Sequence, residues 1–158
     1  MKYALVLIGA LSVSGCAQML AQQQAQIEQS YRDIEQCDSP DLPPAGAVNR
    51  EAFADALGKQ AMYASADKFV MDNKMQQLQY VGWNDSVASS VGACYRSQRQ
   101  ARLDAVKGQF ESLKSSTKGK DERGALISAY SAWEAYMANP SDNLKSDFQS
   151  KLSLYKNI

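Results

Sequence analysis

The segment DSVASSVGACYRSQRQARLDAVKGQFESL, residues 85–113, decides the fold class of this chain. Its apolar side chains recur mostly at steps of three or four residues, at Val87, Val91, Cys94, Leu103, Val106, Phe110 and Leu113. This spacing places them along one face of an α-helix, because the helix repeats every 3.6 residues. No stretch of the sequence alternates with a period of two for long enough to predict a convincing β-strand. The sequence therefore predicts an all-α fold.

Two further helices are predicted before this segment. Residues 17–36 carry a narrow apolar stripe at helical steps, formed by Leu20, Ile27, Tyr31 and Ile34. Residues 38–47 contain three prolines and cannot be helical, because proline lacks an amide donor and restricts the residue before it. Asn49 then offers an N-cap to a second helix, whose pattern continues through Phe69 to Leu78 with a candidate break at Asp72 and Asn73.

Two more helices are predicted after it. Residues 115–120 are polar and contain a glycine, as in a loop. The next apolar stripe consists of Leu126, Tyr130, Trp133 and Met137 and stops at Asn139-Pro140. Ser141 is a candidate N-cap for a last helix with Leu144, Phe148, Leu152 and Tyr155. We therefore expect a bundle of about five helices.

The first fifteen residues have the pattern of a bacterial secretion signal. Lys2 precedes an apolar run, Tyr3 to Val13, that is too short to cross a bilayer as a helix, which needs about 20 apolar residues. The following Val13-Ser14-Gly15-Cys16 resembles the lipobox of bacterial lipoproteins. The resemblance implies cleavage before Cys16 and acylation of that cysteine, which anchors the mature chain in a membrane. The alternative is an ordinary signal peptide with a coincidental cysteine.

The residue after Cys16 bears on where the anchor lies. Many inner-membrane lipoproteins of enteric bacteria carry Asp at this position, whereas this chain has Ala17. By resemblance to that sorting rule, we expect the outer membrane, with the body on its periplasmic face. Residues 1–15 are then a removed signal peptide, and residues 16–158 form one helical periplasmic domain.

Two cysteines remain in the body, Cys37 and Cys94. We predict a disulfide between them, because an exported chain enters an oxidising compartment where cysteine pairs are normally oxidised. The alternatives are two buried free thiols or a redox-active pair, although the usual Cys-x-x-Cys spacing is absent.

Charge and composition argue against several functions. Removal of the signal peptide, with Lys2 as its one charged residue, leaves a mature chain with 16 basic and 17 acidic side chains. Binding of nucleic acid instead favours a strongly basic face. The sequence contains no histidine, which is the usual general base and the commonest zinc ligand. We therefore expect no enzymatic activity, no metal and no cofactor other than the covalent lipid on Cys16.

Two sets of side chains are candidates for partner binding. The aromatic set consists of Trp83, Tyr130, Trp133, Tyr136 and Tyr155, and Trp and Tyr often dominate interface energies. Core packing is the favoured interpretation of their helical spacing. It fits Trp83 least, because Gly82-Trp83-Asn84 is typical of a turn followed by an N-cap for the next helix. The basic set, Arg96, Arg99 and Arg102, is a candidate contact for lipid phosphates or an acidic partner. A solvated helix face is favoured there, because Asp104 interrupts the run.

A second resemblance covers residues 31–95. Cys37-Asp38-Ser39-Pro40-Asp41-Leu42-Pro43, then Gly82-Trp83-Asn84, then Cys94, is similar to the order of motifs in the helical pilotin lipoproteins of type II secretion, the PulS/OutS type. The chain departs from that family in the longer segment 43–82 and in two helices after Cys94. The resemblance implies a groove between helices that accepts a helical tail of a secretin.

The expected function is thus binding of a protein partner, which is a secretin in the pilotin case, during assembly of the envelope or a secretion system. The alternative is a structural lipoprotein of the envelope with no specific peptide client, and an enzyme is the least favoured class.

Overall fold

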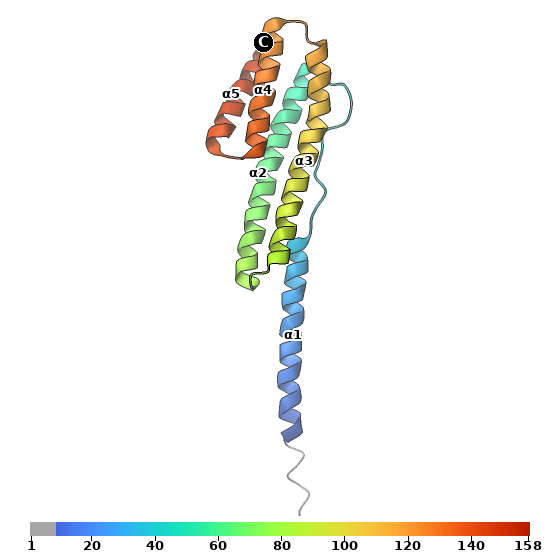
Figure 1. The fold of residues 1–158 in the computed structure, drawn as a ribbon, viewed down its shortest axis with the longest axis vertical. Coiled ribbons are helices and arrows are strands. Elements are labelled where there is room, and N and C mark those ends of the chain that lie inside the picture. Colours follow the sequence, from blue (N-terminus) through green and yellow to red (C-terminus); the bar gives the residue numbers. More distant parts are fainter. Residues whose placement is uncertain (1–8) are drawn as a thin grey trace, which may run out of the picture.

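The structure, a computed structural model, describes the backbone of residues 9–158 and the side chains of residues 17–158. It contains five helices, which are α1 (Gly9–Glu35), α2 (Arg50–Val81), α3 (Asp85–Ser116), α4 (Lys120–Ala138) and α5 (Asp142–Asn157) (Figure 1). No strand occurs among these described residues, so the predicted all-α fold is confirmed. The lipobox prediction falls on side chains that lie outside the described part.

The central element is the antiparallel hairpin of α2 and α3, each 32 residues long (Figure 1). Both helices begin at the predicted caps, since the Asn49 side chain accepts from the Ala52 amide and the Asn84 side chain accepts from the Ser86 and Val87 amides. The hairpin turn contains Gly82 with φ +126°, a conformation that glycine adopts without steric cost. The sequence therefore sets both ends of this hairpin locally.

Two predictions about α2 are wrong. The helix has no break at Asp72-Asn73 and continues to Val81. The Asp72 carboxylate pairs at 2.6 Å with the Lys68 ammonium one turn earlier in the same helix. Phe69 does not continue the buried stripe, since 66% of its surface is exposed. The buried face of α2 turns instead toward α3, where Leu78 is fully covered.

The two ends of this hairpin are covered by different partners. At one end the α4–α5 hairpin closes a large core, whose bulkiest members are Phe53, Leu57, Phe110, Leu126, Tyr130, Trp133, Met137, Phe148 and Tyr155. At the other end the last turns of α1 close a small core, formed by Ile34, Leu78, Val87 and Val91. The body is thus a long hairpin with a separate apolar cluster at each end.

α4 and α5 form the shorter hairpin. α3 continues through Ser116 and α4 begins at Lys120, so the predicted loop shrinks to residues 117–119. Ser141 occupies the N-cap position of α5, but its side chain makes no capping hydrogen bond, so the prediction of a serine side-chain cap is wrong. Its backbone carbonyl instead accepts the Lys145 amide at 2.8 Å.

α1 leaves the body as a projecting stalk (Figure 1). Its attachment is the buried Ile34 together with Tyr31, whose hydroxyl donates to the Gly82 carbonyl at 3.0 Å. Residues 17–26 are exposed throughout, including Leu20 of the predicted stripe. No helix among the described residues is both long and apolar enough to span a membrane.

The chain between α1 and α2, residues 36–49, is called the connector here. It runs along α3 without helical structure, as its prolines predict. Cys37 in the connector forms a disulfide with Cys94 of α3, with the two Cα atoms 5.8 Å apart. The predicted Cys37–Cys94 disulfide is therefore confirmed, and it joins the end of α1 to the third helix.

The disulfide should supply much of the stability of this chain. It closes a loop with a sequence separation of 57 residues. On the chain-entropy model, the double variant Cys37→Ser/Cys94→Ser should lose about 4 kcal/mol of unfolding free energy in urea denaturation. Reductant should destabilise the wild type to a similar degree and leave the double variant unchanged. A loss below about 1 kcal/mol would show that the connector holds its place without the covalent bond.

The two tryptophans should differ sharply in their contribution to stability. Trp133 is fully buried in the large core, whereas 54% of Trp83 is exposed. Trp133→Ala should therefore lower the unfolding free energy by about 3–5 kcal/mol, because it leaves a cavity. Trp83→Ala should change it by about 0.5 kcal/mol or less. Equal losses in the two variants would contradict the assignment of Trp133 to the core.

Candidate partner-binding surface

The structure separates the aromatic candidates. Trp133 is 0% and Tyr130 5% exposed, and the Tyr130 ring stacks on Phe110 with centroids 3.8 Å apart. Burial raises the pKa of the Tyr130 hydroxyl, which therefore stays neutral. This placement confirms core packing, the favoured interpretation, for Tyr130 and Trp133. It corrects the alternative in which they line a groove, because almost none of their surface is accessible to a partner. Trp83 remains accessible, and its indole N–H donates to Asp85 Oδ1 at 2.7 Å.

The basic candidates also diverge. Arg96 is exposed, as a solvated helix face predicts. Arg99 is half-buried and donates to the Ala138 carbonyl at the end of α4, 3.0 Å away. Arg102 is buried with 3% of its surface exposed, so the solvated-face interpretation is wrong for this residue. The three arginines therefore do not form one accessible stripe.

Arg102 instead joins three segments of the chain. Its Nε and Nη2 each lie 2.9 Å from Oδ2 of Asp67 on α2. Its Nη1 donates to the Gln60 side chain at 2.8 Å and to the Asp41 carbonyl in the connector at 2.7 Å. A buried guanidinium needs such partners, because an unpaired buried charge is strongly unfavourable. No sequence pattern indicates this role, because Arg102 has the same three-residue spacing as the exposed Arg96 and the half-buried Arg99.

Further side chains hold the connector against the hairpin. Gln98 and Gln109 of α3 donate to the Asp38 and Pro44 carbonyls at 2.7 and 2.8 Å. The Asp41 carboxylate accepts from Tyr63 and pairs with Lys59, and these contacts, the Tyr63 hydrogen bond first, lower the pKa of Asp41. The connector is thus fixed mainly through its backbone carbonyls.

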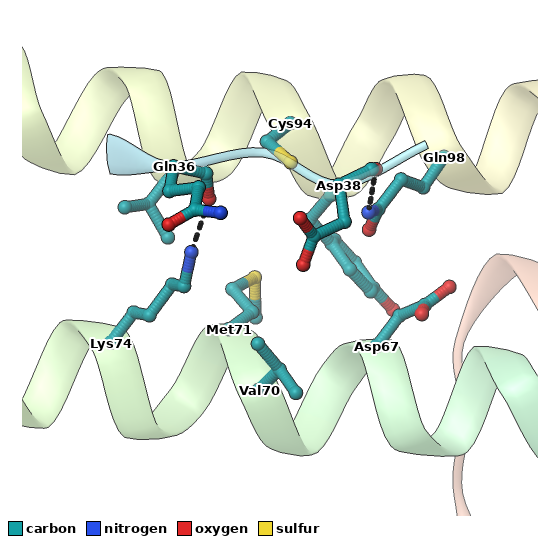
Figure 2. A pocket seen from close by; sticks show the side chains of 10 residues that line it. Gln36, Asp38, Asp67, Val70, Met71, Lys74, Cys94 and Gln98 are labelled. Carbon is teal, nitrogen blue, oxygen red and sulfur yellow. Dashed lines mark hydrogen bonds between the residues drawn. The ribbon is translucent and has the colours of Figure 1, made fainter. Parts of the chain in front are cut away.

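A small cavity lies beside the disulfide, between α2, α3 and the connector (Figure 2). Figure 2 shows Lys74 reaching from α2 to the Gln36 carbonyl and Gln98 reaching from α3 to the Asp38 carbonyl. Its volume of about 40 Å³ is enough for a water molecule but not for an organic ligand. This cavity belongs to the attachment of the connector.

A much larger depression lies between α2 and α5 and is called the α2–α5 groove. Its volume is about 350 Å³, and its lining residues are Gly58, Ala61, Met62, Ser65, Tyr136, Lys145, Phe148, Gln149 and Leu152. The Tyr136 and Phe148 rings lie parallel beneath it, 6.3 Å apart between centroids, and only 3% and 2% of their surfaces are exposed. The groove is therefore an apolar slot with an ordered floor, which is the usual character of a binding site.

Polar groups and flexible side chains edge this groove. The Ser65 and Tyr136 hydroxyls bond to each other, so neither is left without a partner inside the slot. Met62 lines the groove with 60% of its surface exposed, and methionine adapts readily to different partners. Lys145 takes part in none of the ion pairs found among the described residues. The groove thus offers apolar contacts with one available positive charge.

Sequence reasoning missed most of this groove. The sequence places Tyr136 among the aromatic candidates and Phe148 and Leu152 on the apolar stripe of the last helix, but Gly58, Met62 and Ser65 carry no functional signal. The described residues contain no cluster of three or more His, Cys, Asp or Glu side chains that could hold a metal ion. The lining of the α2–α5 groove is mainly apolar, which suits contact with apolar side chains of a partner.

Removal of the Arg102 guanidinium should destabilise the whole body. Arg102→Ala leaves Asp67, Gln60 and the Asp41 carbonyl without their shared donor, and should cost about 3–5 kcal/mol of unfolding free energy in urea denaturation. Arg96→Ala, on the same helix but exposed, should change stability by about 0.5 kcal/mol or less. If both variants unfold at the same urea concentration, the Arg102 network is not a stabilising centre.

Comparison of the chain with known proteins returned no match. No protein-family model, no curated protein and no solved structure is similar to it at the level required for a match.

Proposed function

We propose that this chain is a non-enzymatic lipoprotein of the outer membrane that binds a segment of a partner protein in the α2–α5 groove. The observation that carries the proposal is the groove itself, an apolar slot of about 350 Å³ between two helices. A bundle that acts only as a spacer would be more stable with this slot filled, because filling it would bury more apolar surface.

The shape of the groove suits a helical segment. Two neighbouring helices, α2 and α5, form its walls, and an amphipathic helix commonly lays its apolar face into a groove of this kind. The available Lys145 ammonium at the edge favours a partner that carries an acidic side chain beside its apolar residues. In the pilotin version of the proposal, the segment is the helical tail of a secretin subunit.

The geometry of α1 supports an anchor at one end and binding at the other. Along the helix, Cys16 lies about 22 Å from Tyr31, which contacts the α2–α3 turn. Met62 lies about 30 Å farther along α2 from that turn. A groove so far from the proposed lipid suits a partner segment in the periplasm, whereas bilayer lipids near the anchor would not reach it.

The anchor is tested by the fate of Cys16. Full-length wild type should yield a mature chain that begins at an acylated Cys16 and sediments with outer membranes. Cys16→Ser should prevent acylation and cleavage at this site, which mass spectrometry of the purified chain detects. Cys37→Ser/Cys94→Ser is the matched control, because it removes two other cysteines and should leave the acylation unchanged. An unmodified Cys16 in the wild type would refute the anchor.

The groove is tested by capture of the partner. The lipidated full chain, isolated from detergent-solubilised envelopes, should carry one envelope protein, such as a secretin, in stoichiometric amount. Gly58→Phe adds a ring inside the groove and should reduce this recovery at least tenfold. Gly108→Phe is the matched control, because nothing lies within 4 Å of a Cβ placed there. Equal recovery from both variants would exclude the groove, and recovery of abundant envelope proteins alone would favour a structural role.

A further inference from the structure

The α2–α5 groove is open at the end nearest the α4–α5 turn. A second cavity of about 200 Å³ lies there and shares three lining residues with the groove, namely Ser65, Tyr136 and Lys145. Its other lining residues include Lys68 on α2 and Pro140 in the turn. The turn therefore borders this end of the groove without closing it, so a segment bound in the groove can continue along α2.

The row of α2 residues that lines the groove continues past the turn with an exposed phenylalanine. Gly58, Met62 and Ser65 line the groove and are followed by Phe69, at steps of four, three and four residues. These steps keep the four residues on one face of the helix. Phe69 exposes 66% of its surface, although its side chain is large and apolar. α2 thus extends the apolar lining of the groove by one helical turn.

Beyond Phe69 this face of α2 becomes polar. The next positions at helical spacing are Asp72, Asn73 and Gln76. In Figure 1 this part of α2 has no helix of the α4–α5 hairpin beside it. Tyr80 exposes 82% of its surface farther along, but it borders a separate cavity against α1. The apolar surface that is continuous with the groove therefore ends at Phe69.

We infer that the partner segment bound in the α2–α5 groove continues past the α4–α5 turn and packs an apolar side chain on Phe69. The longer contact rests on the proposed function, because it belongs to the same bound segment. From Gly58 to Phe69 the helix rises about 16 Å, so a helical segment that lies along α2 needs about 11 residues to cover both. One amphipathic helix of this length buries the groove and the Phe69 ring together.

Lys145 adds a charge preference to this segment. It lines both the groove and the second cavity, and among the described residues it takes part in no ion pair. The other charged residues that line the second cavity are Lys68, which pairs with Asp72, and Asp142. An acidic side chain of the partner is therefore favoured beside Lys145, about one helical turn from the apolar side chain that packs on Phe69.

Site-specific photo-cross-linking in the full-length, lipidated chain tests this longer contact. p-Benzoylphenylalanine replaces Met62 inside the groove, Phe69 past the turn, or Tyr80 near the end of α2, and intact cells are irradiated. Positions 62 and 69 should give adducts with the same envelope protein, identified by mass spectrometry, and position 80 should give none with it. Gly58→Phe should reduce both adducts about tenfold, because one segment makes both contacts. Gly108→Phe should leave both adducts unchanged.

The other outcomes overturn the longer contact and show separately whether the groove is occupied. An adduct at position 62 without one at position 69 would confine the partner to the groove and leave the partner-binding proposal intact. An adduct at position 69 with a different protein, or one that Gly58→Phe does not weaken, would give Phe69 another occupant. An adduct of twice the monomer mass would make that occupant a second copy of the chain. Absence of adducts at both positions would refute the groove proposal as well.

The variant Phe69→Ala measures how much this side chain adds to binding. It should weaken binding of the cross-linked protein about tenfold, because Phe69 packs on the same segment as the groove. Tyr80→Ala is the matched control, an exposed aromatic on the same helix, and should change binding about twofold or less. Neither variant should change the Tm of the body, because both side chains are exposed. Equal weakening by the two variants would contradict a contact that ends at Phe69.

Discussion

The buried guanidinium of Arg102 joins the segments on which the rest of the structure depends. It bonds Asp67 and Gln60 of α2 from its own position on α3, and it fixes the connector through the Asp41 carbonyl. A helical hairpin is held together mainly by apolar contacts, which are weakly directional, whereas these hydrogen bonds set the register of three segments at once. The disulfide at Cys37 fixes the same connector covalently, closer to α1.

Once the connector is fixed, the length of the α2–α3 hairpin determines the shape of the molecule. Helices of 32 residues are longer than α4 or α5, with 19 and 16 residues, so the α4–α5 hairpin covers only one end. The short segment of α1 that is buried closes the other end, and the remainder projects as a stalk (Figure 1). The two ends of the molecule can therefore serve different functions. The proposed lipid anchor, Cys16, lies on the projecting α1, and the α2–α5 groove lies at the opposite end of the body.

This division also explains why α2 has two kinds of exposed surface. Beside α5 its residues line the α2–α5 groove, and past the α4–α5 turn it carries the exposed Phe69 and Tyr80. Both surfaces include large apolar side chains that a lone soluble monomer would leave in contact with water.

The sequence by itself determined the helices, their caps at Asn49 and Asn84, the non-helical connector and the disulfide partners. These features depend on local rules, namely helical spacing, amide capping and proline geometry, and on there being one cysteine pair in the body. Only the tertiary structure decided that Arg102 is buried while Arg96 is exposed, and that Phe69 faces outward. Each of these depends on which neighbouring helix covers a given face and where that helix ends. Periodicity shows that a face is apolar, but it does not show what packs on it.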